Sequence, residues 1–390
     1  MSTTTPQPAR YIMIGGFLGA GKTTAMGRLA RHLTDQGLRV GLITNDQAGG
    51  LVDTQLMRHQ GFATEEIAGG CFCCRFNTLV DAAARLTEAT RPDVFIAEPV
   101  GSCTDLVATV TYPLRRMYGA DFTIAPLSVL VDPIRARRIL GLDAGGNFSS
   151  KVAYIYKKQL EEADVIVINK QELLSPAQLT ELVDALETTF PDSFVITASA
   201  RDQSGLSAWF DILTQETQGI HAPMEMDYAV YADGEALLGW LNATLTLTAE
   251  EEFDANDFLR ALAADLQTRL QNEYAEVAHL KMTYSPDDGI AGEIASINLV
   301  RNDNAPESGM MLDEPSAGGQ LILNLRAETA PEILHSALLA SLESVAPSFI
   351  GLTASLDHQE HFRPGKPVPT HRDGESGEIR GGCVPATGCC

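Results

Sequence analysis

The sequence predicts an α/β domain with a mostly parallel sheet, followed by a smaller α+β domain and a disordered tail. Between residues 11 and 217, short apolar runs alternate with stretches of helical periodicity, which is typical of parallel strands covered by helices on both faces. Beyond a polar stretch, longer strand-like runs and two long helical segments replace this alternation. At 390 residues the chain also exceeds the roughly 250–300 residues that one core usually supports. We expect a first domain at 1–218, a linker at 219–226, a second domain at 227–360 and a tail at 361–390.

Strands of the first domain are expected where apolar residues run together before a polar or glycine-containing turn. These strands are expected at 11–14, 38–44, 93–97, 122–131, 164–168 and 193–197. Amphipathic periodicity predicts connecting helices at 24–36, 76–90, 104–118, 133–140, 149–162 and 176–190. A further helix is expected to follow the second strand and to end at residue 59.

The second domain mixes strands with two long helices. Strands are expected at 240–248, 276–284, 290–301 and 320–326, and helices at 254–274 and 330–345. The segment at 302–319 is long and polar, and we expect a mobile loop there. From residue 363 onward few residues suit a core, which predicts a disordered tail.

The formal net charge of −23 is the least ordinary property of the composition. Nucleic acids and anionic membranes both require a basic face, so we expect neither as a partner. The first ten residues lack the basic start and apolar core of a signal peptide, and no apolar run reaches membrane-spanning length. We therefore expect a cytoplasmic protein whose seven cysteines are reduced, so that clustered cysteines indicate metal or catalytic sites.

A phosphate-binding loop is the strongest motif. Gly16, Gly21, Lys22 and Thr23 match the pattern G-x-x-x-x-G-K-[ST] between a predicted strand and an amphipathic helix, a context that a merely Gly-rich turn would not explain. Glycines let backbone N–H groups turn toward phosphate oxygens, while Lys22 reaches the β- and γ-phosphates and the Thr23 hydroxyl binds Mg²⁺. The expected triphosphate contacts are Gly16, Gly19, Ala20, Gly21, Lys22, Thr23 and Thr24.

Two acidic turns are expected beside the γ-phosphate. Asp46 follows the second strand, and Glu98 stands at the end of the third strand, three residues before Gly101. An acid at the tip of a strand suits a group near Mg²⁺, and the Gly101 N–H suits the γ-phosphate. Together with Lys22, these two acids are the expected catalytic residues.

A base-reading element is predicted at Asn169-Lys170-x-Glu172, directly after a buried strand. Its carboxylate would accept hydrogen bonds from guanine N1–H and the exocyclic amine, which adenine does not present in that arrangement. Glu172 is one methylene longer than the Asp usual in such elements, and an asparagine that merely starts a helix is the alternative explanation. Ser199 and Ala200, after the next strand, are expected to complete the guanine side.

Cys71, Cys73 and Cys74 form the second strong motif. Thiolates are soft ligands for Zn²⁺ and related ions, and three thiols leave a fourth position open, which suits exchange or transfer of the ion. Adjacent Cys73 and Cys74 are poorly placed for an ordinary disulfide. The alternative is that these are small buried hydrophobes, and for Cys103, which stands alone, burial is the expected role.

Three further cysteines, Cys383, Cys389 and Cys390, lie near the end of the predicted tail, which also carries His371. A disordered segment has no core for thiols to fill. Our hypothesis is that the tail captures metal and passes it to the Cys-x-Cys-Cys loop, or completes its coordination. The alternative is that a chain terminus tolerates any residue type at little cost.

Together, the phosphate loop, the GGCFCC segment, the turn at 98–101 and NKQE resemble the CobW-type GTPases, relatives of the urease and hydrogenase nickel-accessory GTPases. The resemblance covers the whole first domain. It implies a GTPase that uses GTP and Mg²⁺, binds a transition metal through Cys-x-Cys-Cys and delivers it to a metal-dependent client protein. Zn²⁺ is the first choice, with Co²⁺, Ni²⁺ or Fe²⁺ as alternatives.

The chain departs from the family pattern at two turns. Asn45-Asp46-Gln47 replaces an acid-rich segment, and Pro99-Val100 replaces a threonine-rich turn. A second hypothesis is therefore a nucleotide-gated assembly or reactivation factor for a cofactor enzyme, such as a corrinoid protein. The sequence leaves the oligomeric state open, with a homodimer as one option.

Overall fold

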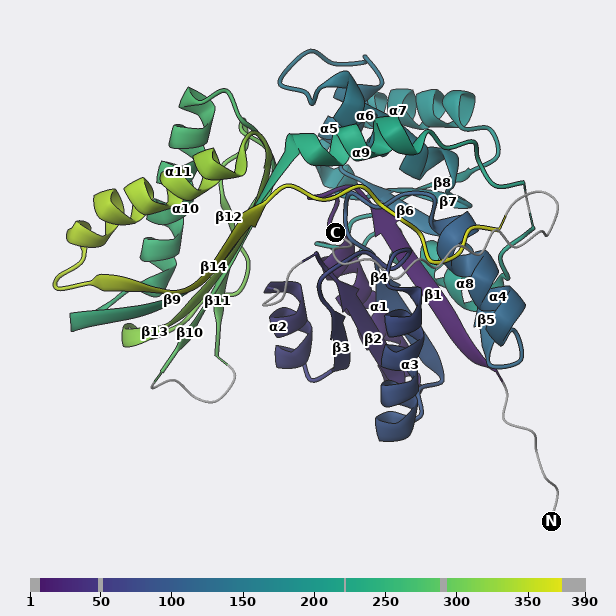
Figure 1. Ribbon diagram of the computed structural model, residues 1–390, viewed down its shortest axis with the longest axis horizontal. Coiled ribbons are helices and arrows are strands. Elements are labelled where there is room, and N and C mark those ends of the chain that lie inside the picture. The colour runs from purple at the N-terminus through teal and green to yellow at the C-terminus, as the bar shows by residue number, and fades with distance from the viewer. Residues whose placement is uncertain (1–7, 48–51, 221, 288–292, 374–390) are drawn as a thin grey trace.

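The computed structural model describes residues 8–47, 52–220, 222–287 and 293–373, which form two sheets with their own covering helices (Figure 1). The first sheet is parallel throughout, in the order β3-β2-β4-β1-β6-β7-β8, and β5 also pairs with β1. The second sheet is antiparallel, in the order β12-β11-β10-β13-β9-β14. The predicted fold class, an α/β domain followed by a smaller α+β domain, is confirmed.

The first sheet contains one break and one strand that the sequence patterns did not predict. Its strands are β1 Ala9–Gly16, β2 Val40–Asn45, β3 Ala63–Ile67, β4 Val94–Glu98, β5 Phe122–Ile124, β6 Ser128–Val131, β7 Val165–Ile168 and β8 Phe194–Thr197. The strand expected at 122–131 is divided into β5 and β6 around Pro126, which has no N–H for the ladder. Edge strand β3 was missed because the charged Glu65 and Glu66 conceal its short apolar pattern.

The helices of this domain agree with the expected order, with one addition. They are α1 Lys22–Asp35, α2 Val52–His59, α3 Phe76–Thr90, the π-helical turn η1 Val107–Thr111, α4 Tyr112–Tyr118, α5 Pro133–Ile139, α6 Ser150–Glu161, the short 3-10 turn η2 Gln171–Leu173, α7 Pro176–Thr189 and α8 Leu206–Gln215. Helix α8 was not predicted, and the helix expected at 104–118 begins with the π-helical turn.

Strand β1 lies in the middle of the first sheet and supplies side chains to two cores. Tyr11 and Met13 pack in the core with α3 and α6, whereas Ile12 and Ile14 pack in the core with α1 and α8. Helices therefore cover both faces of the sheet, as expected for parallel strands. The carboxyl ends of these strands meet at one edge, where the loops carry the predicted site residues.

Two long helices of the second domain cover one face of its sheet, and its first helix packs against α6 of the first domain. The elements of the second domain are α9 Tyr228–Leu237, β9 Leu238–Phe253, α10 Ala255–Asn272, β10 Glu276–Pro286, β11 Ala295–Leu299, β12 Glu307–Ser308, β13 Ser316–Glu328, α11 Pro331–Val345, the 3-10 turn η3 Ala346–Ser348 and β14 Thr353–Phe362. On β10, Leu280 and Met282 enter the core with α10 and α11, and the alternating His279 and Lys281 face the first domain. Within the described ranges, no helix has the length and apolarity needed to cross a membrane.

The second half of the chain differs from the expectations in several places. The segment at 302–319 is mostly irregular, but it contains the two-residue strand β12 and the first residues of β13, and its mobility remains a prediction. Strand β14 and helix α9 were missed. Residues 363–373, expected to be disordered, run back across the first domain as an extended segment that we call the strap (Figure 1, yellow). Residues 374–390, with Cys383, Cys389 and Cys390, lie outside the described residues.

Candidate nucleotide and metal site

The loop from β1 to α1 has a backbone that only glycine can adopt at two positions. Gly16 has φ 130°, and a Cβ there would lie 2.4 Å from the Leu130 carbonyl oxygen. Gly21 has φ 91°, and a Cβ there would lie 2.4 Å from Asn169 Nδ2. Both contacts are impossible for a side chain, so the loop can pass close to its neighbours only with these glycines. Helix α1 then starts at Lys22 and presents its N-terminal N–H groups to the cavity described below.

Lys22, Thr23 and Glu98 form a buried polar cluster at the start of α1. Thr23 Oγ1 donates to Glu98 Oε1 at 3.2 Å, and Lys22 Nζ lies 3.8 Å from the same oxygen. Burial, followed by the charge of Asp53, raises the pKa of Glu98 to about 7. Glu98 Oε2 is buried without a hydrogen-bond partner among the described residues. A hydroxyl and an unpaired carboxylate oxygen form a donor set that Mg²⁺ accepts.

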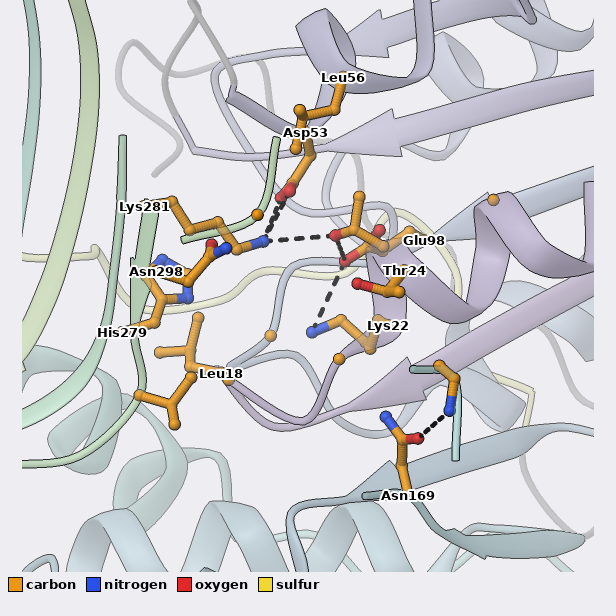
Figure 2. Close-up of a pocket in the computed structure, with 18 of the residues that line it drawn as sticks. Leu18, Lys22, Thr24, Asp53, Leu56, Glu98, Asn169, His279, Lys281 and Asn298 are labelled. Atoms are coloured by element: carbon orange, nitrogen blue, oxygen red, sulfur yellow. Dashed lines mark hydrogen bonds and ion pairs between the residues drawn. The ribbon is translucent and has the colours of Figure 1, made fainter. Parts of the chain in front are cut away.

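The second domain reaches this cluster through Lys281 of β10 (Figure 2). Lys281 Nζ lies 2.6 and 2.7 Å from the two carboxylate oxygens of Asp53 on α2, and 3.3 Å from Thr23 Oγ1. A lysine ammonium therefore lies beside the hydroxyl that is expected to bind Mg²⁺. Because two positive charges this close repel strongly in a partly buried site, Mg²⁺ at Thr23 requires Lys281 to move.

Asp46 is also engaged by the second domain. Arg326 Nη2 of β13 donates to Asp46 Oδ2 at 2.9 Å and to Oδ1 at 3.2 Å. The guanidinium carbon lies 3.9 Å from the ring centroid of Trp240, and Arg326 is fully buried. Burial raises the pKa of Asp46, although the charge of Arg326 opposes this. A catalytic role for Asp46 remains a prediction, and it requires this ion pair to open.

The predicted base-reading residues hold the phosphate loop in place. Asn169 Nδ2 donates to the Ala20 carbonyl at 2.8 Å, and Asn169 Oδ1 accepts from the Ala200 N–H at 2.9 Å. Lys170 Nζ donates to the Gly19 carbonyl at 2.8 Å. The structure thus brings together the phosphate loop, the Asn-Lys element and the loop after β8.

Asp132 is not among the predicted site residues. It connects the Asn169-Lys170 element to the second domain. Its carboxylate contacts Lys170 Nζ at 2.9 Å and Arg301 Nη1 at 3.0 Å, and caps α5 by accepting from the Arg135 N–H at 3.1 Å. Burial alone would raise the pKa of Asp132, but the charges of Lys170, Arg301 and Arg135 prevail and lower it to about 2. Asp132 is therefore ionised under all ordinary conditions.

Glu172 and Ser199 have different surroundings. Glu172 is exposed in the short turn η2 and lines the cavity, so its carboxylate is open to a ligand. Ser199 is fully buried, and its Oγ accepts from the Asp202 N–H at 3.2 Å, which shapes the loop. Recognition of guanine by Glu172 remains a prediction.

One cavity of about 710 Å³ joins these groups, a volume within the usual range for small-molecule sites. Its walls come from both domains (Figure 2). The predicted site residues that line it are Gly19, Gly21, Lys22, Thr23, Thr24, Asp46, Glu98, Gly101, Asn169, Lys170, Glu172 and Ala200. The second domain contributes His279, Lys281, Asn298, Val300 and Arg326, among others.

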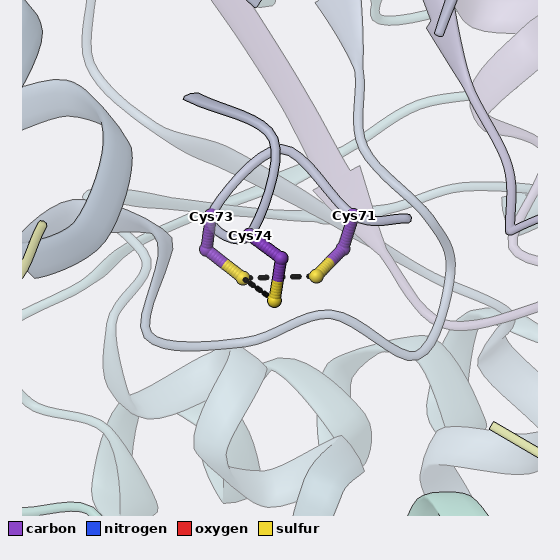
Figure 3. Close-up of side chains that lie close together, drawn as sticks. All are labelled: Cys71, Cys73 and Cys74. Carbon is purple, nitrogen blue, oxygen red and sulfur yellow. Dashed lines mark hydrogen bonds between the residues drawn. The ribbon is translucent and has the colours of Figure 1, made fainter. Parts of the chain in front are cut away.

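The three predicted metal ligands converge in the loop between β3 and α3 (Figure 3). The Sγ atoms of Cys71, Cys73 and Cys74 all lie within 4.8 Å of one another, with 3.0 Å between Cys71 and Cys73 and 3.8 Å between Cys73 and Cys74. Tetrahedral Zn²⁺ with bonds of about 2.3 Å places its sulfurs about 3.8 Å apart, so the Cys71–Cys73 pair must open by less than about 1 Å, and the Cys73–Cys74 pair already has this spacing. Hydrogen bonds with Cys71 and Cys74, together with burial, raise the pKa of Cys73.

The cysteine loop is attached to the γ-phosphate side of the cavity by Asn45. This residue at the end of β2 donates from Nδ2 to the carbonyls of Ile67, at 2.9 Å, and Gly70, at 2.7 Å. Asp46 is the next residue in the chain. A displacement of the turn at Asp46 would therefore be transmitted to the backbone that precedes Cys71.

The strap crosses the same loop. The Val368 N–H donates to Cys74 Sγ at 3.3 Å, and the Thr370 N–H donates to the Cys73 carbonyl at 2.8 Å. The His371 ring packs edge-on against Phe76, with 5.0 Å between centroids. The strap therefore contacts one thiol, that of Cys74, and the backbone of the cysteine loop, which was not expected of a tail.

Four site residues were missed because their partners are distant in sequence: Asp53, Asp132, Lys281 and Arg326. Asp132 follows directly on the end of β6, the kind of position that the sequence reasoning used for Glu98. Lys281 and Arg326 are charged residues within predicted strands. A charge in an otherwise apolar strand pattern was the available signal, because such a residue requires a partner.

Comparisons with known proteins place the first domain of this chain among one group of nucleotide-binding domains. Residues 10–197 match the model of the CobW/HypB/UreG nucleotide-binding domain. Zinc chaperone CobW of Sinorhizobium sp is 28% identical over 197 residues, which are 45% of this chain and 54% of that protein. Zinc chaperone YeiR of Escherichia coli (strain K12) is 28% identical over 170 residues, 43% of this chain and 48% of that protein. This chain thus spans about half the length of these curated relatives.

One solved structure, that of Zn(II)-bound YjiA GTPase from E. coli, aligns with 86% of this chain and 99% of its own at 12% identity. Its TM-score of 0.36 is too low to support an inference. The match to the family model is the stronger evidence, because it spans the phosphate loop, the cysteine loop and the Asn169-Lys170 element. The nucleotide-binding domain of this chain, residues 10–197, belongs to the CobW/HypB/UreG family.

Proposed function

We propose that this protein is a GTP-hydrolysing metallochaperone that binds Zn²⁺ through Cys71, Cys73 and Cys74 and delivers it to a metal-dependent client protein. The observation that carries this proposal is a cavity lined by the phosphate loop together with a cluster of three thiols, two of them buried, whose loop is connected to the end of β2 by Asn45. The relatives named zinc chaperones favour zinc as the ion. Co²⁺, Ni²⁺ and Fe²⁺ are the alternatives, because the same thiol set accepts them.

Each end of the cavity has a role in holding GTP. Lys22 and the α1 N-terminus would bind the β- and γ-phosphates, and Glu172 would accept from the guanine base. Thr23 and Glu98 would hold Mg²⁺, which neutralises the developing charge on the transferred phosphoryl group. Burial raises the pKa of Glu98 to about 7 in the metal-free site, and the charge of a bound Mg²⁺ would lower it, so Glu98 would be ionised when it holds the ion.

Metal handling follows from the chemistry of the thiols. Zn²⁺ binds thiolates, so capture must release the protons that the buried thiols retain. Three sulfur ligands leave one tetrahedral position for an incoming ligand from a client. The strap lies over this loop, so transfer to a client requires the contacts of Val368 and Thr370 to open.

Two substitutions separate the nucleotide and metal functions. Lys22→Ala should abolish GTP binding in calorimetry, because the phosphate charge loses its counter-ion, and zinc binding should persist. Cys73→Ala should weaken zinc in competition with a chromophoric chelator, and GTP binding should persist. Lys157→Ala, an exposed lysine on α6, is the matched control for both assays. Unchanged GTP affinity in Lys22→Ala, or unchanged zinc affinity in Cys73→Ala, would refute the corresponding half of the proposal.

Purified zinc-loaded protein should then transfer its ion to a zinc-dependent apo-enzyme faster with GTP than with GDP. The recovered activity and the loss of zinc from the donor measure the transfer. A donor that retains its zinc in every nucleotide state would contradict the delivery role.

A further inference from the structure

We propose that Lys281 is a γ-phosphate-binding residue that the second domain supplies to the nucleotide site, and that it favours GTP over GDP. This inference rests on the proposed function, because it assumes that the cavity holds GTP together with Mg²⁺. It adds to the phosphate loop a residue from a different sheet. The second domain then takes a direct part in distinguishing the two nucleotides.

The Lys281 ammonium lies on the side of the cavity where the γ-phosphate is expected. Its Nζ contacts both carboxylate oxygens of Asp53, at 2.6 and 2.7 Å, and lies 3.3 Å from Thr23 Oγ1. Figure 2 shows Lys281 and Lys22 pointing into the same space beside Glu98, each from its own domain. Lys22 is the residue expected to reach the β- and γ-phosphates. A second ammonium in the same space is therefore placed to contact the same phosphate.

Two contacts hold β10 against the phosphate loop, so the position of Lys281 requires no closing movement of the domains. Arg135 Nη1 donates to the carbonyl of Leu18, at 2.8 Å, and to that of Ala278, at 3.3 Å. A Cβ at Gly19 would lie 3.1 Å from the same Ala278 carbonyl oxygen. Ala278 belongs to β10, as Lys281 does. The strand that carries the ammonium is thus packed directly on the loop that is expected to bind phosphate.

Mg²⁺ at Thr23 favours a change of partner for Lys281. Burial alone would lower the pKa of Lys281, but the charges of Asp53 and Glu98 prevail and raise it, so the side chain is a cation at neutral pH. Repulsion by Mg²⁺ drives this cation from Thr23, while Asp53 and Glu98 retain a positive charge beside them. A compact ammonium on a flexible four-carbon stem can then turn to the γ-phosphate oxygens. GDP lacks this acceptor, so with GDP the ammonium would gain no new partner by leaving Asp53.

The other basic side chains that the second domain contributes to the described cavity wall are less suited to this role. Arg326 is fully buried, with its guanidinium against Trp240 and paired with Asp46. Burial, followed by the charge of Lys281, lowers the pKa of His279, so its ring is neutral. The Lys281 side chain is 18% exposed and has room to change partner. Lys281 is therefore the cation of this wall that can follow the nucleotide.

Calorimetry of the full chain with a non-hydrolysable GTP analogue and with GDP, both in the presence of Mg²⁺, tests this role. Lys281→Met keeps an unbranched side chain of similar length and removes the charge. A hydrogen bond between charged groups contributes the equivalent of roughly tenfold or more in affinity, so the ratio of the GTP-analogue affinity to the GDP affinity should fall about tenfold. The GDP affinity itself should not fall. Lys157→Met, which removes an exposed lysine of α6, should keep the wild-type ratio.

Phosphorus NMR of the bound analogue provides a readout that a general loosening of the domains would not reproduce. The γ-phosphorus resonance should shift in Lys281→Met, because the ammonium beside that atom is lost, and the α-phosphorus resonance should stay close to its wild-type position. Lys157→Met should leave both resonances unchanged.

The outcomes separate this inference from the proposed function. An unchanged affinity ratio or an unchanged γ-phosphorus resonance in Lys281→Met would overturn the role of Lys281 and leave the metallochaperone intact. A loss of affinity for the GTP analogue and for GDP by the same factor would also overturn it, because general damage to the cavity would then explain the effect. Absence of GTP-analogue binding by the wild type would instead refute the proposed function.

Discussion

Replacing Asp132 by Asn should destabilise the protein by an amount that depends on pH in a defined way. The Asp132 carboxylate contacts Lys170 and Arg301, and its pKa is lowered from 3.8 to about 2. Each pKa unit corresponds to about 1.4 kcal/mol, so ionised Asp132 contributes about 2 kcal/mol at neutral pH. Because the folded pKa lies below the unfolded one, this contribution is complete above about pH 4 and is lost as pH falls toward 2, with roughly half remaining at pH 3.

Urea unfolding followed by circular dichroism measures this difference. Asp132→Asn keeps an oxygen for the α5 cap but removes the charge, so it should lower the unfolding free energy by about 2 kcal/mol at pH 7 and by about half as much at pH 3. Asp233→Asn is the control, because Asp233 pairs with Lys151 at the surface, where both side chains are at least half exposed, and exposed pairs contribute about 0–1 kcal/mol. A loss in Asp132→Asn that is equal at both pH values would refute the reasoning.

Lys281→Met should raise the affinity for Mg²⁺ in the absence of nucleotide about tenfold, because it removes a positive charge 3.3 Å from the Thr23 hydroxyl. An unchanged Mg²⁺ affinity in calorimetry would contradict the placement of the Mg²⁺ site. Glu172→Asp should sharpen the preference for GTP over ATP in competition binding, and equal GTP and ATP affinities in the wild type would refute the guanine assignment. Truncation after Gly382 should lower zinc stoichiometry or slow zinc loading with GTP binding intact, because the removed cysteines are covalently linked to the strap, and a short linker gives an effective concentration of about millimolar. Identical loading would exclude the tail from the mechanism.

Local patterns predicted the first domain well. The expected helix at 76–90 coincides with α3, and β2, β4, β7 and β8 lie within two residues of their expected positions. Each of these elements depends on its own apolar spacing, which a sequence displays directly. The phosphate loop and the Asn169-Lys170 element were found for a similar reason, because the tight backbone of the loop and the side-chain contacts that hold it require particular residue types at fixed spacing.

What the sequence did not predict depends on contacts between distant segments. Nothing near Lys281 indicates that it meets Asp53 across the domains, and nothing near Arg326 indicates that it meets Asp46. The strap is a similar case. It has few apolar residues, but Arg372 pairs with Asp105, which is 1% exposed, and this contact fixes a segment that composition alone assigned to disorder. By contrast, the burial expected for the isolated Cys103 is confirmed, because this residue is 1% exposed and packs in the core.

The central claim is that nucleotide state changes the affinity of the thiol site for zinc. Chelator competition with the wild type, in the presence of a non-hydrolysable GTP analogue and then of GDP, measures this directly. We expect the zinc affinities in the two nucleotide states to differ by about fivefold or more, which corresponds to about 1 kcal/mol of coupling free energy. By linkage, zinc should change the affinity for the GTP analogue relative to GDP by the same factor. Identical zinc affinities in the two nucleotide states would contradict the account and reduce the cysteine loop to a structural zinc site.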